Sequence, residues 1–174
     1  MTVLDDIEAS IPALRRYARA LVRDRDRADD LVQDCLERAV AKRHLWRGDG
    51  PVQAWLFRIL INRYRDLQRQ NPSPGHLVAI EDLTHEPAQG GSQESSLALR
   101  EVRDAMARLP GDQREALLIV ALEGKSFDQA ASLLDIPKGT LMSRLARARA
   151  TLRLLTGRNV GPTQTKGPSQ GARP

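Results

Sequence analysis

The segment that most restricts the fold runs from Asn71 to Ser96, "NPSPGHLVAIEDLTHEPAQGGSQESS". It is rich in proline, glycine, serine and glutamine, it carries acidic residues, and it contains neither lysine nor arginine. This composition favours a flexible connection over packed structure. We therefore expect an acidic linker that divides the 174-residue chain into two small folded parts.

Helical patterns fill the part before the linker, and strand signals are almost absent. Ser10 is the predicted N-cap and Pro12 lies in the first turn of a helix over 10–24. A second helix is expected from about Arg27 to Lys42, and a third from near Pro51 to about Arg69. The predicted buried stripe of the second helix comprises Leu31, Val32, Cys35, Leu36, Ala39 and Val40.

Helical patterns also fill the part after the linker. Helices are expected over Ser96–Leu109, closed by Pro110, and over Asp112–Leu122, closed by Gly124. Two more follow in "SFDQAASLLDIPKGTLMSRLARARATL". The predicted fold is all-α, with a domain over 1–70, the flexible linker over 71–96, a second domain over 97–156 and a disordered tail over 157–174.

The last two helices have the pattern of a helix-turn-helix. Ser126 and Gln129 fit a capping box, and the turn "LDIP" leads into a new helix at Pro137. The predicted core stripe of this helix comprises Leu141, Leu145, Ala148, Leu152 and Leu155. The outward face is small, polar and cationic, with Thr140, Ser143 and Arg147 opposite the stripe, Arg144 on one flank, and Lys138, Met142 and Arg149 on the other. Such a helix fits the major groove of DNA, and a helical hairpin with a solvated basic face is the alternative.

Charge is unevenly distributed in this chain of net charge +5. No aspartate or glutamate follows Asp135, whereas lysines and arginines continue to the end. A terminal third of one sign indicates an acidic partner, most commonly nucleic acid.

The third helix presents a second cationic stripe, formed by Arg58, Asn62, Arg65 and Arg69. The loop before it, "HLWRGDGPVQ", carries Trp46 and Arg47. Bases stack on aromatic rings while arginine pairs with phosphates, so this combination suits unpaired nucleic acid. The alternative is that Trp46 and Trp55 anchor the core and that the stripe is only solvated.

Acidic and amide side chains share one face of the second helix: Asp30, Gln33, Asp34 and Glu37. They either improve solubility or contact a protein partner with a basic surface.

Several functions have no support in the sequence. The single cysteine excludes an internal disulfide, and three scattered histidines lack metal-ligand spacing, so we expect no metal and no cofactor. Catalytic residue sets and phosphate-binding loops are missing, which predicts a protein that is not an enzyme. The sequence predicts neither a membrane-spanning segment nor a signal peptide, and hence a cytoplasmic location.

Taken together, four motifs resemble one family. "DRADDLVQDCLERAV", "WRGDG", "QAWLFRILINRYRDLQRQ" and "LPGDQREALLIVALEGKSFDQAASLLDIPKGTLMSRLARARATL" are similar, in this order, to the extracytoplasmic-function (ECF) sigma factors of bacterial RNA polymerase. The match spans about residues 10–156. It implies a region 2 domain followed by a region 4 domain with a helix-turn-helix (winged-helix-like) fold.

The resemblance implies a role for each constellation. Asp30, Gln33, Asp34 and Glu37 would dock on the β′ clamp of core polymerase. Trp46, Arg47, Gly48 and Asp49 would capture a flipped base of the minus-ten element, with Arg58, Asn62 and Arg65 against the non-template strand. Lys138, Thr140, Ser143, Arg144 and Arg147 would recognise the minus-thirty-five element, and the second domain would touch the β flap. The linker would thread through the RNA channel.

Two departures from the family stand in the helix-turn-helix. Asp135 occupies a turn position where glycine is usual, and Lys138 replaces a common apolar residue. The leading hypothesis is an alternative sigma factor restrained by an anti-sigma factor. Two alternatives stay open: a sigma-like decoy that sequesters an anti-sigma factor, against which the lack of a receiver domain weighs, and a stand-alone helix-turn-helix regulator.

Overall fold

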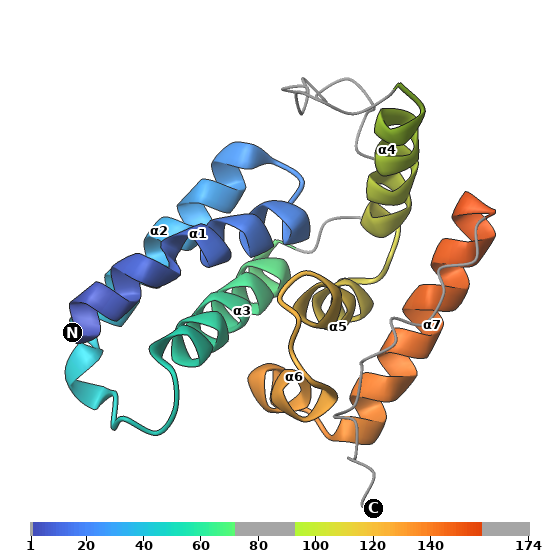
Figure 1. Ribbon diagram of the computed structural model, residues 1–174. Coiled ribbons are helices and arrows are strands. Elements are labelled where there is room, and N and C mark those ends of the chain that lie inside the picture. Colours follow the sequence, from blue (N-terminus) through green and yellow to red (C-terminus); the bar gives the residue numbers. More distant parts are fainter. Residues whose placement is uncertain (1, 72–92, 158–174) are drawn as a thin grey trace, which may run out of the picture.

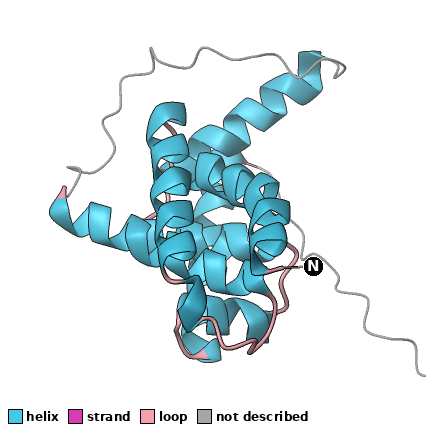
Figure 2. Ribbon diagram, turned by 90° about the vertical axis from the view of Figure 1, so that its left-hand side faces the viewer, coloured by secondary structure: helices cyan, strands magenta, loops and turns pink. Residues whose placement is uncertain are grey.

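The computed structural model describes residues 2–71 and 93–157. The described part consists of seven α-helices and one short 3-10 helix and contains no strand (Figure 2). The all-α prediction is therefore confirmed. The described residues of the second domain contain the helices of a winged-helix-like domain but no strand. The predicted tail after 157 and most of the predicted linker lie outside the described residues.

The helices form two halves in chain order (Figure 1). The N-terminal half contains α1 (Val3–Leu21), α2 (Arg25–Ala41), η1 (Arg43–Leu45) and α3 (Val52–Gln70). The C-terminal half contains α4 (Gln93–Ala107), α5 (Gly111–Ala121), α6 (Phe127–Leu134) and α7 (Lys138–Thr156). Helix α4 begins inside the range assigned to the linker.

The predicted start of the first helix is wrong. Helix α1 begins at Val3 because Thr2 and Asp5 form a capping box, in which the Thr2 N–H donates to the Asp5 carboxylate at 2.6 Å. Ser10 lies inside the helix, and its hydroxyl donates to the Asp6 carbonyl oxygen at 2.7 Å. Pro12 also lies inside; its missing N–H leaves the carbonyl of the exposed Glu8 to water.

Helices α1, α2 and α3 pack against one another around a continuous apolar core. Tyr17 and Phe57 meet edge to face with ring centroids 5.3 Å apart. Cys35 is fully buried, as predicted, and its thiol donates to the Leu56 carbonyl oxygen at 3.4 Å. Val40 was expected in the core, but it lies in the last turn of α2 and is 40% exposed.

In the C-terminal half, α7 packs against α4, α5 and α6. Leu141, Leu145, Ala148 and Leu152 are buried, which confirms most of the predicted stripe. Leu155 is 40% exposed, contrary to prediction, because it lies in the last turn of α7 beyond the buried stripe. The capping box of Ser126 and Gln129 opens α6 as predicted.

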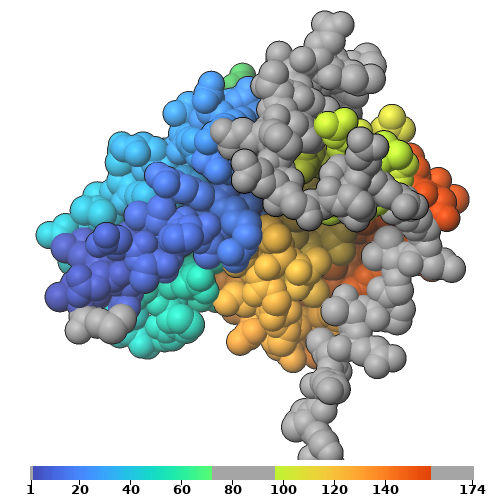
Figure 3. Space-filling model, turned by 45° about the horizontal axis from the view of Figure 1, so that its top comes forward, coloured from blue at the N-terminus to red at the C-terminus, as the bar shows by residue number. Residues whose placement is uncertain are grey.

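The two halves are packed against each other, which the sequence did not predict. Helix α1 contacts α5 and α3 contacts α6, and one hydrophobic cluster includes buried residues of both halves. In the space-filling view the N-terminal half lies directly against α5 and α6 (Figure 3). The surroundings of the residues expected to meet DNA therefore depend on how close each one lies to the boundary between the two halves.

Candidate nucleic-acid and polymerase interface

The loop between α2 and α3 exposes the first predicted group. Trp46 is half-buried and packs against the core, whereas Arg47, Gly48 and Asp49 are exposed. Gly48 and Gly50 have φ values of +78° and +102°, and no atom lies within 4 Å of a Cβ built at either position. Backbone conformation, and not crowding, therefore requires glycine in this loop.

The predicted stripe on α3 faces the C-terminal half. Arg58 Nη2 donates to Ser132 Oγ of α6 at 2.8 Å. Arg58 and Asn62 line a groove of about 480 Å³ whose other wall is formed by residues 131–133 and 135–137. The two side chains are exposed, but they open into this groove between the halves.

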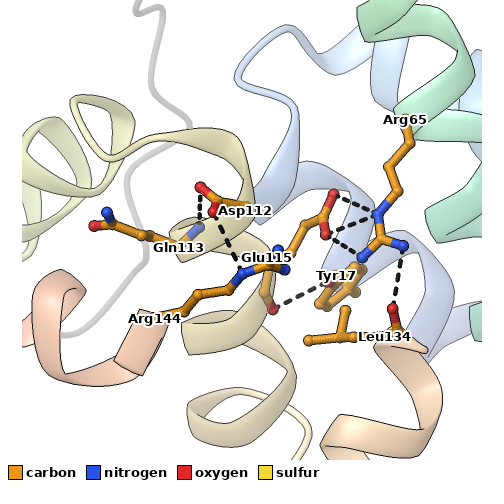
Figure 4. Close-up of polar contacts among 7 residues, drawn as sticks. All are labelled: Tyr17, Arg65, Asp112, Gln113, Glu115, Leu134 and Arg144. Atoms are coloured by element: carbon orange, nitrogen blue, oxygen red, sulfur yellow. Dashed lines mark hydrogen bonds and ion pairs between the residues drawn. The ribbon is translucent and has the colours of Figure 1, made fainter. Parts of the chain in front are cut away.

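Arg65 of the same stripe is engaged within the protein. Its Nη2 lies 2.8 Å and its Nε 3.1 Å from Oε2 of Glu115 in α5, and its Nη1 donates to the Leu134 carbonyl oxygen at 3.1 Å (Figure 4). The Glu115 side chain is only 3% exposed. Burial raises the pKa of Glu115, and the hydrogen bonds from Arg65 offset part of this effect.

Glu115 is a residue that the sequence interpretation missed. Its backbone carbonyl accepts a hydrogen bond from the Tyr17 hydroxyl at 3.3 Å, so α1, α3 and α5 meet at this one residue (Figure 4). A signal was available: Glu115, Leu118 and Leu122 share one face of α5, which places a carboxylate at a core position. A buried carboxylate needs a partner, but the sequence does not name it.

The helix-turn-helix has the expected shape. Asp135, the C-cap of α6, has φ 54° and ψ 50°, the left-handed conformation for which glycine is usual. Its N–H donates to the Ser132 carbonyl at 3.3 Å, and Pro137 then starts α7. The turn therefore keeps its geometry with aspartate in place of glycine.

The predicted DNA-facing residues of α7 differ in their surroundings. Ser143 and Arg147 are exposed and Thr140 is half-buried, which agrees with the helical periodicity. Lys138 Nζ lies 2.9 Å from Oδ1 of Asp128 in α6. Arg144 Nε lies 3.3 Å from Oδ2 of Asp112 in α5, and its side chain is 22% exposed (Figure 4). Of the two arginines predicted to face DNA, Arg147 is exposed, whereas Arg144 also holds α7 on α5 through Asp112.

The residues on the acidic face of α2 also differ in whether they are exposed or paired within the protein. Asp30 is exposed, and Gln33 Nε2 donates to Oε1 of Glu37 at 3.0 Å. Asp34 accepts hydrogen bonds from Arg38 and from Arg63 of α3. Partial burial acts to raise the pKa of Asp34, but these two arginines outweigh it and lower the pKa. Asp34 therefore joins α2 to α3, while Asp30, Gln33 and Glu37 stay available to a partner.

The described residues contain no group of three histidine, cysteine or carboxylate side chains able to hold a metal ion. Within the same residues, no helix combines the length and apolar character needed to cross a membrane.

Comparison with known proteins assigns the two halves to known domain families. Residues 7–61 match the model "Sigma2 domain of PhyR", and residues 99–152 match the model "Sigma-70, region 4". The fold and its helix-turn-helix thus define a two-domain sigma-type protein.

Relatives of similar length narrow this class. The chain is 37% identical over 168 residues to the ECF RNA polymerase sigma factor EcfG of Rhodopseudomonas palustris, covering 92% of this chain and 91% of the relative. It is 36% identical over 145 residues to SigM of Mycobacterium tuberculosis, covering 83% and 71%. The chain belongs to the ECF sigma factors, which are alternative sigma factors that direct RNA polymerase to particular promoters.

Solved structures agree with this assignment. The sigma factor RpoE of Bartonella quintana, solved in complex with the anti-sigma factor NepR, has 35% identity and a TM-score of 0.72, covering 88% of this chain and 95% of that one. The anti-anti-sigma factor PhyR of the same organism has a TM-score of 0.61 but 17% identity, and the match covers 50% of its chain. The likeness to PhyR therefore concerns the fold alone.

Proposed function

We propose that this sigma factor recognises two promoter elements with separate halves of the chain, as a non-catalytic specificity subunit of cytoplasmic RNA polymerase. The N-terminal half, over about 1–70, binds core enzyme and the melted minus-ten element. The C-terminal half, over about 97–156, recognises the minus-thirty-five element. The exposed Arg147 on an otherwise well-packed helix-turn-helix is the observation that carries this proposal.

At the minus-thirty-five element, the outward face of α7 enters the major groove. Ser143 and Arg147 lie on the exposed face, opposite the buried Leu141 and Leu145. Arginine donates two parallel hydrogen bonds to guanine, whereas serine bonds to several bases, so Arg147 dominates the specificity. Lys138 and Arg144 contact phosphates once their carboxylate partners are displaced or shared.

At the minus-ten element, the glycine-containing loop captures an unpaired base. Trp46 supplies a ring for stacking, and Arg47 and Asp49 supply polar groups beside it. Stacking on an aromatic side chain contributes roughly 1–3 kcal/mol per base, which offsets an unpairing cost of a few kcal/mol. Arg58, Asn62 and Arg65 then follow the non-template strand along α3.

The acidic face of α2 docks on a basic surface of core polymerase. Asp30, Gln33 and Glu37 are directed to solvent, and Asp34 holds the helix in place through Arg63. We assign this surface to the β′ clamp and the second half to the β flap. An anti-sigma factor regulates the chain, as the complex of RpoE with NepR suggests by its 35% identity.

Transcription with core enzyme tests the proposal. The chain and core polymerase are incubated with a library of genomic fragments, and the run-off products are sequenced. We expect products from a limited set of fragments, their loss with Arg147→Ala, and their retention with Arg15→Ala, which removes an exposed arginine of α1. Absence of products from every fragment with the unaltered chain would contradict sigma activity.

A decoy is the second candidate, favoured by the match of residues 7–61 to the PhyR domain model. A decoy binds an anti-sigma factor and leaves DNA alone. In that case no fragment yields a product, and Arg147→Ala leaves anti-sigma binding unchanged.

A further inference from the structure

Contacts between the two halves place three promoter-facing residues of α3 at an internal boundary. Arg58 bonds to Ser132 of α6, Asn62 lines the groove against residues 131–133, and Arg65 binds Glu115 of α5. The α3 residues predicted to meet the minus-ten element thus lie against α6, and α6 in turn contacts α7, which carries the residues predicted to meet the minus-thirty-five element (Figure 1).

This arrangement cannot contact both elements of one promoter. By their names, the two elements are about 25 base pairs apart, which corresponds to about 85 Å of B-form DNA. In the structure, Arg58 of the first surface lies 2.8 Å from Ser132 in the helix that precedes α7. The halves must therefore separate before both elements are bound.

Arg65 carries the largest share of the polar contacts at this boundary. Three of its nitrogen atoms donate to the C-terminal half, two of them to the carboxylate of Glu115. A carboxylate accepts the two parallel hydrogen bonds of a guanidinium as a phosphate does. While Glu115 is in place, Arg65 has no such pair of donors for a nucleic-acid phosphate.

We propose that Glu115 acts as an internal competitor of nucleic acid for Arg65 and holds the free chain in an inactive, closed arrangement. The proposal rests on the proposed function, because it takes Arg65 as a contact of the melted strand. Separation of the halves releases Arg65 from Glu115 and exposes Arg58 and Asn62 in the same step. Because the Glu115 side chain is only 3% exposed, separating it from Arg65 within the closed arrangement would leave a buried charge without its partner, which costs more than breaking an ion pair at the surface.

Other contacts across the boundary serve as comparisons. Arg16 donates to both carboxylate oxygens of Glu123 at 3.0 Å, and this pair supports the closed state from α1. Arg23 Nη2 lies 2.8 Å from Oδ1 of Asp104, but these side chains are 32% and 53% exposed. We expect the Arg23 and Asp104 pair to contribute little, since solvent screens it.

The distance between the halves tests the proposal without DNA or polymerase. Spin labels are attached to Ala9→Cys in α1 and Ala150→Cys in α7, both exposed, in a Cys35→Ser background. The unaltered chain, labelled at both positions, should give one narrow distance distribution. Glu115→Gln should raise the separated fraction at least about tenfold, and Asp104→Asn should change it less than about twofold.

A second substitution keeps the test decisive if Glu115→Gln fails to fold. Arg65→Lys retains the positive charge but loses the two parallel donors, so it should also separate the halves. The double variant Glu115→Gln with Arg65→Lys should open no further than the more open single variant, because both remove the same contact. A folded Glu115→Gln or Arg65→Lys chain with the unaltered distance distribution would overturn the proposal.

Binding of a fluorescent twelve-nucleotide oligothymidylate completes the experiment. Glu115→Gln should bind it at least about tenfold more tightly than the unaltered chain, and added Arg65→Gln should remove the part of the gain that Arg65 supplies, leaving the part that Arg58 and Asn62 supply. If the halves separate but affinity does not rise, Glu115 is no competitor and the proposal fails as stated. Promoter-specific transcription is measured separately, so a failed competitor and a failed sigma activity give different results.

Discussion

Arg114 of α5 donates to the carbonyl oxygen of Leu21, the last residue of α1, at 3.1 Å. The same guanidinium donates to carbonyl oxygens of Met106, Ala107 and Leu109 at 3.0, 2.9 and 2.8 Å. Leu21 and Ala107 are the last residues of α1 and α4, where no further helical N–H follows, whereas the Met106 carbonyl also accepts from the Leu109 N–H at 3.2 Å. One buried arginine therefore closes two helices and links the halves.

Removal of Arg114 should destabilise the whole protein. Arg114→Met leaves the buried carbonyl oxygens of Leu21, Ala107 and Leu109 without this donor, so the free energy of unfolding should fall by roughly 2–4 kcal/mol in a urea titration. Arg108→Met is the matched control, because Arg108 is exposed just after α4, and it should change stability by less than about 0.5 kcal/mol. Equal stability of the two variants would contradict the assigned role.

The turn of the helix-turn-helix should gain stability from glycine. Asp135 has φ 54°, which strains an L-residue and costs glycine nothing sterically. Asp135→Gly should raise the free energy of unfolding by about 0.5–1 kcal/mol, and Asp135→Val should lower it by at least about 1 kcal/mol. A urea titration in which Asp135→Gly is the less stable of the two would disprove the strain argument.

Cys35 should be chemically inert while the protein is folded. Burial raises the pKa of its thiol to about 12, so only about one molecule in ten thousand carries a thiolate at pH 8. Reaction with Ellman's reagent should be at least about a thousandfold slower than in urea, and it should accelerate as pH rises towards 12. Ala9→Cys provides an exposed control that reacts at once. Rapid reaction of native Cys35 would show that the second helix opens.

Arg144→Ala and Arg147→Ala should differ in their effects on stability and on DNA binding. Arg144→Ala loses the partly exposed ion pair with Asp112 and should lower the free energy of unfolding by about 0.5–1 kcal/mol. Arg147→Ala should leave stability within about 0.5 kcal/mol but weaken binding to a duplex selected by the run-off assay by about 1–3 kcal/mol.

Asp112→Asn is the matching control for Arg144. It should reproduce the loss of stability without weakening the binding of the protein to the duplex, since Asp112 itself does not contact DNA. A urea titration measures the stability, and fluorescence anisotropy of the labelled duplex against salt concentration measures the binding. Loss of duplex binding in Asp112→Asn but not in Arg147→Ala would reverse the assignment of the two arginines.

Local features of this protein were predictable from the sequence because they depend on neighbours along one helix. The leucine stripe of α7 follows from the helical period, and the capping box of α6 from two residues three positions apart. The exposure of Arg147 follows from the same period. The start of α1 was missed because Ser10 and Pro12 match the usual signals, yet Thr2 and Asp5 form a better cap upstream.

The pattern of residues along the chain predicts most of the helices, most of their buried faces and the family to which their motifs belong. It does not predict that Arg65 contacts Glu115 or that Arg114 contacts Leu21, because these partners lie far apart along the chain. Periodicity places a side chain on a face of its own helix, but contact across two halves depends on how those halves dock. Burial of Glu115 then makes a partner obligatory, and docking supplies Arg65.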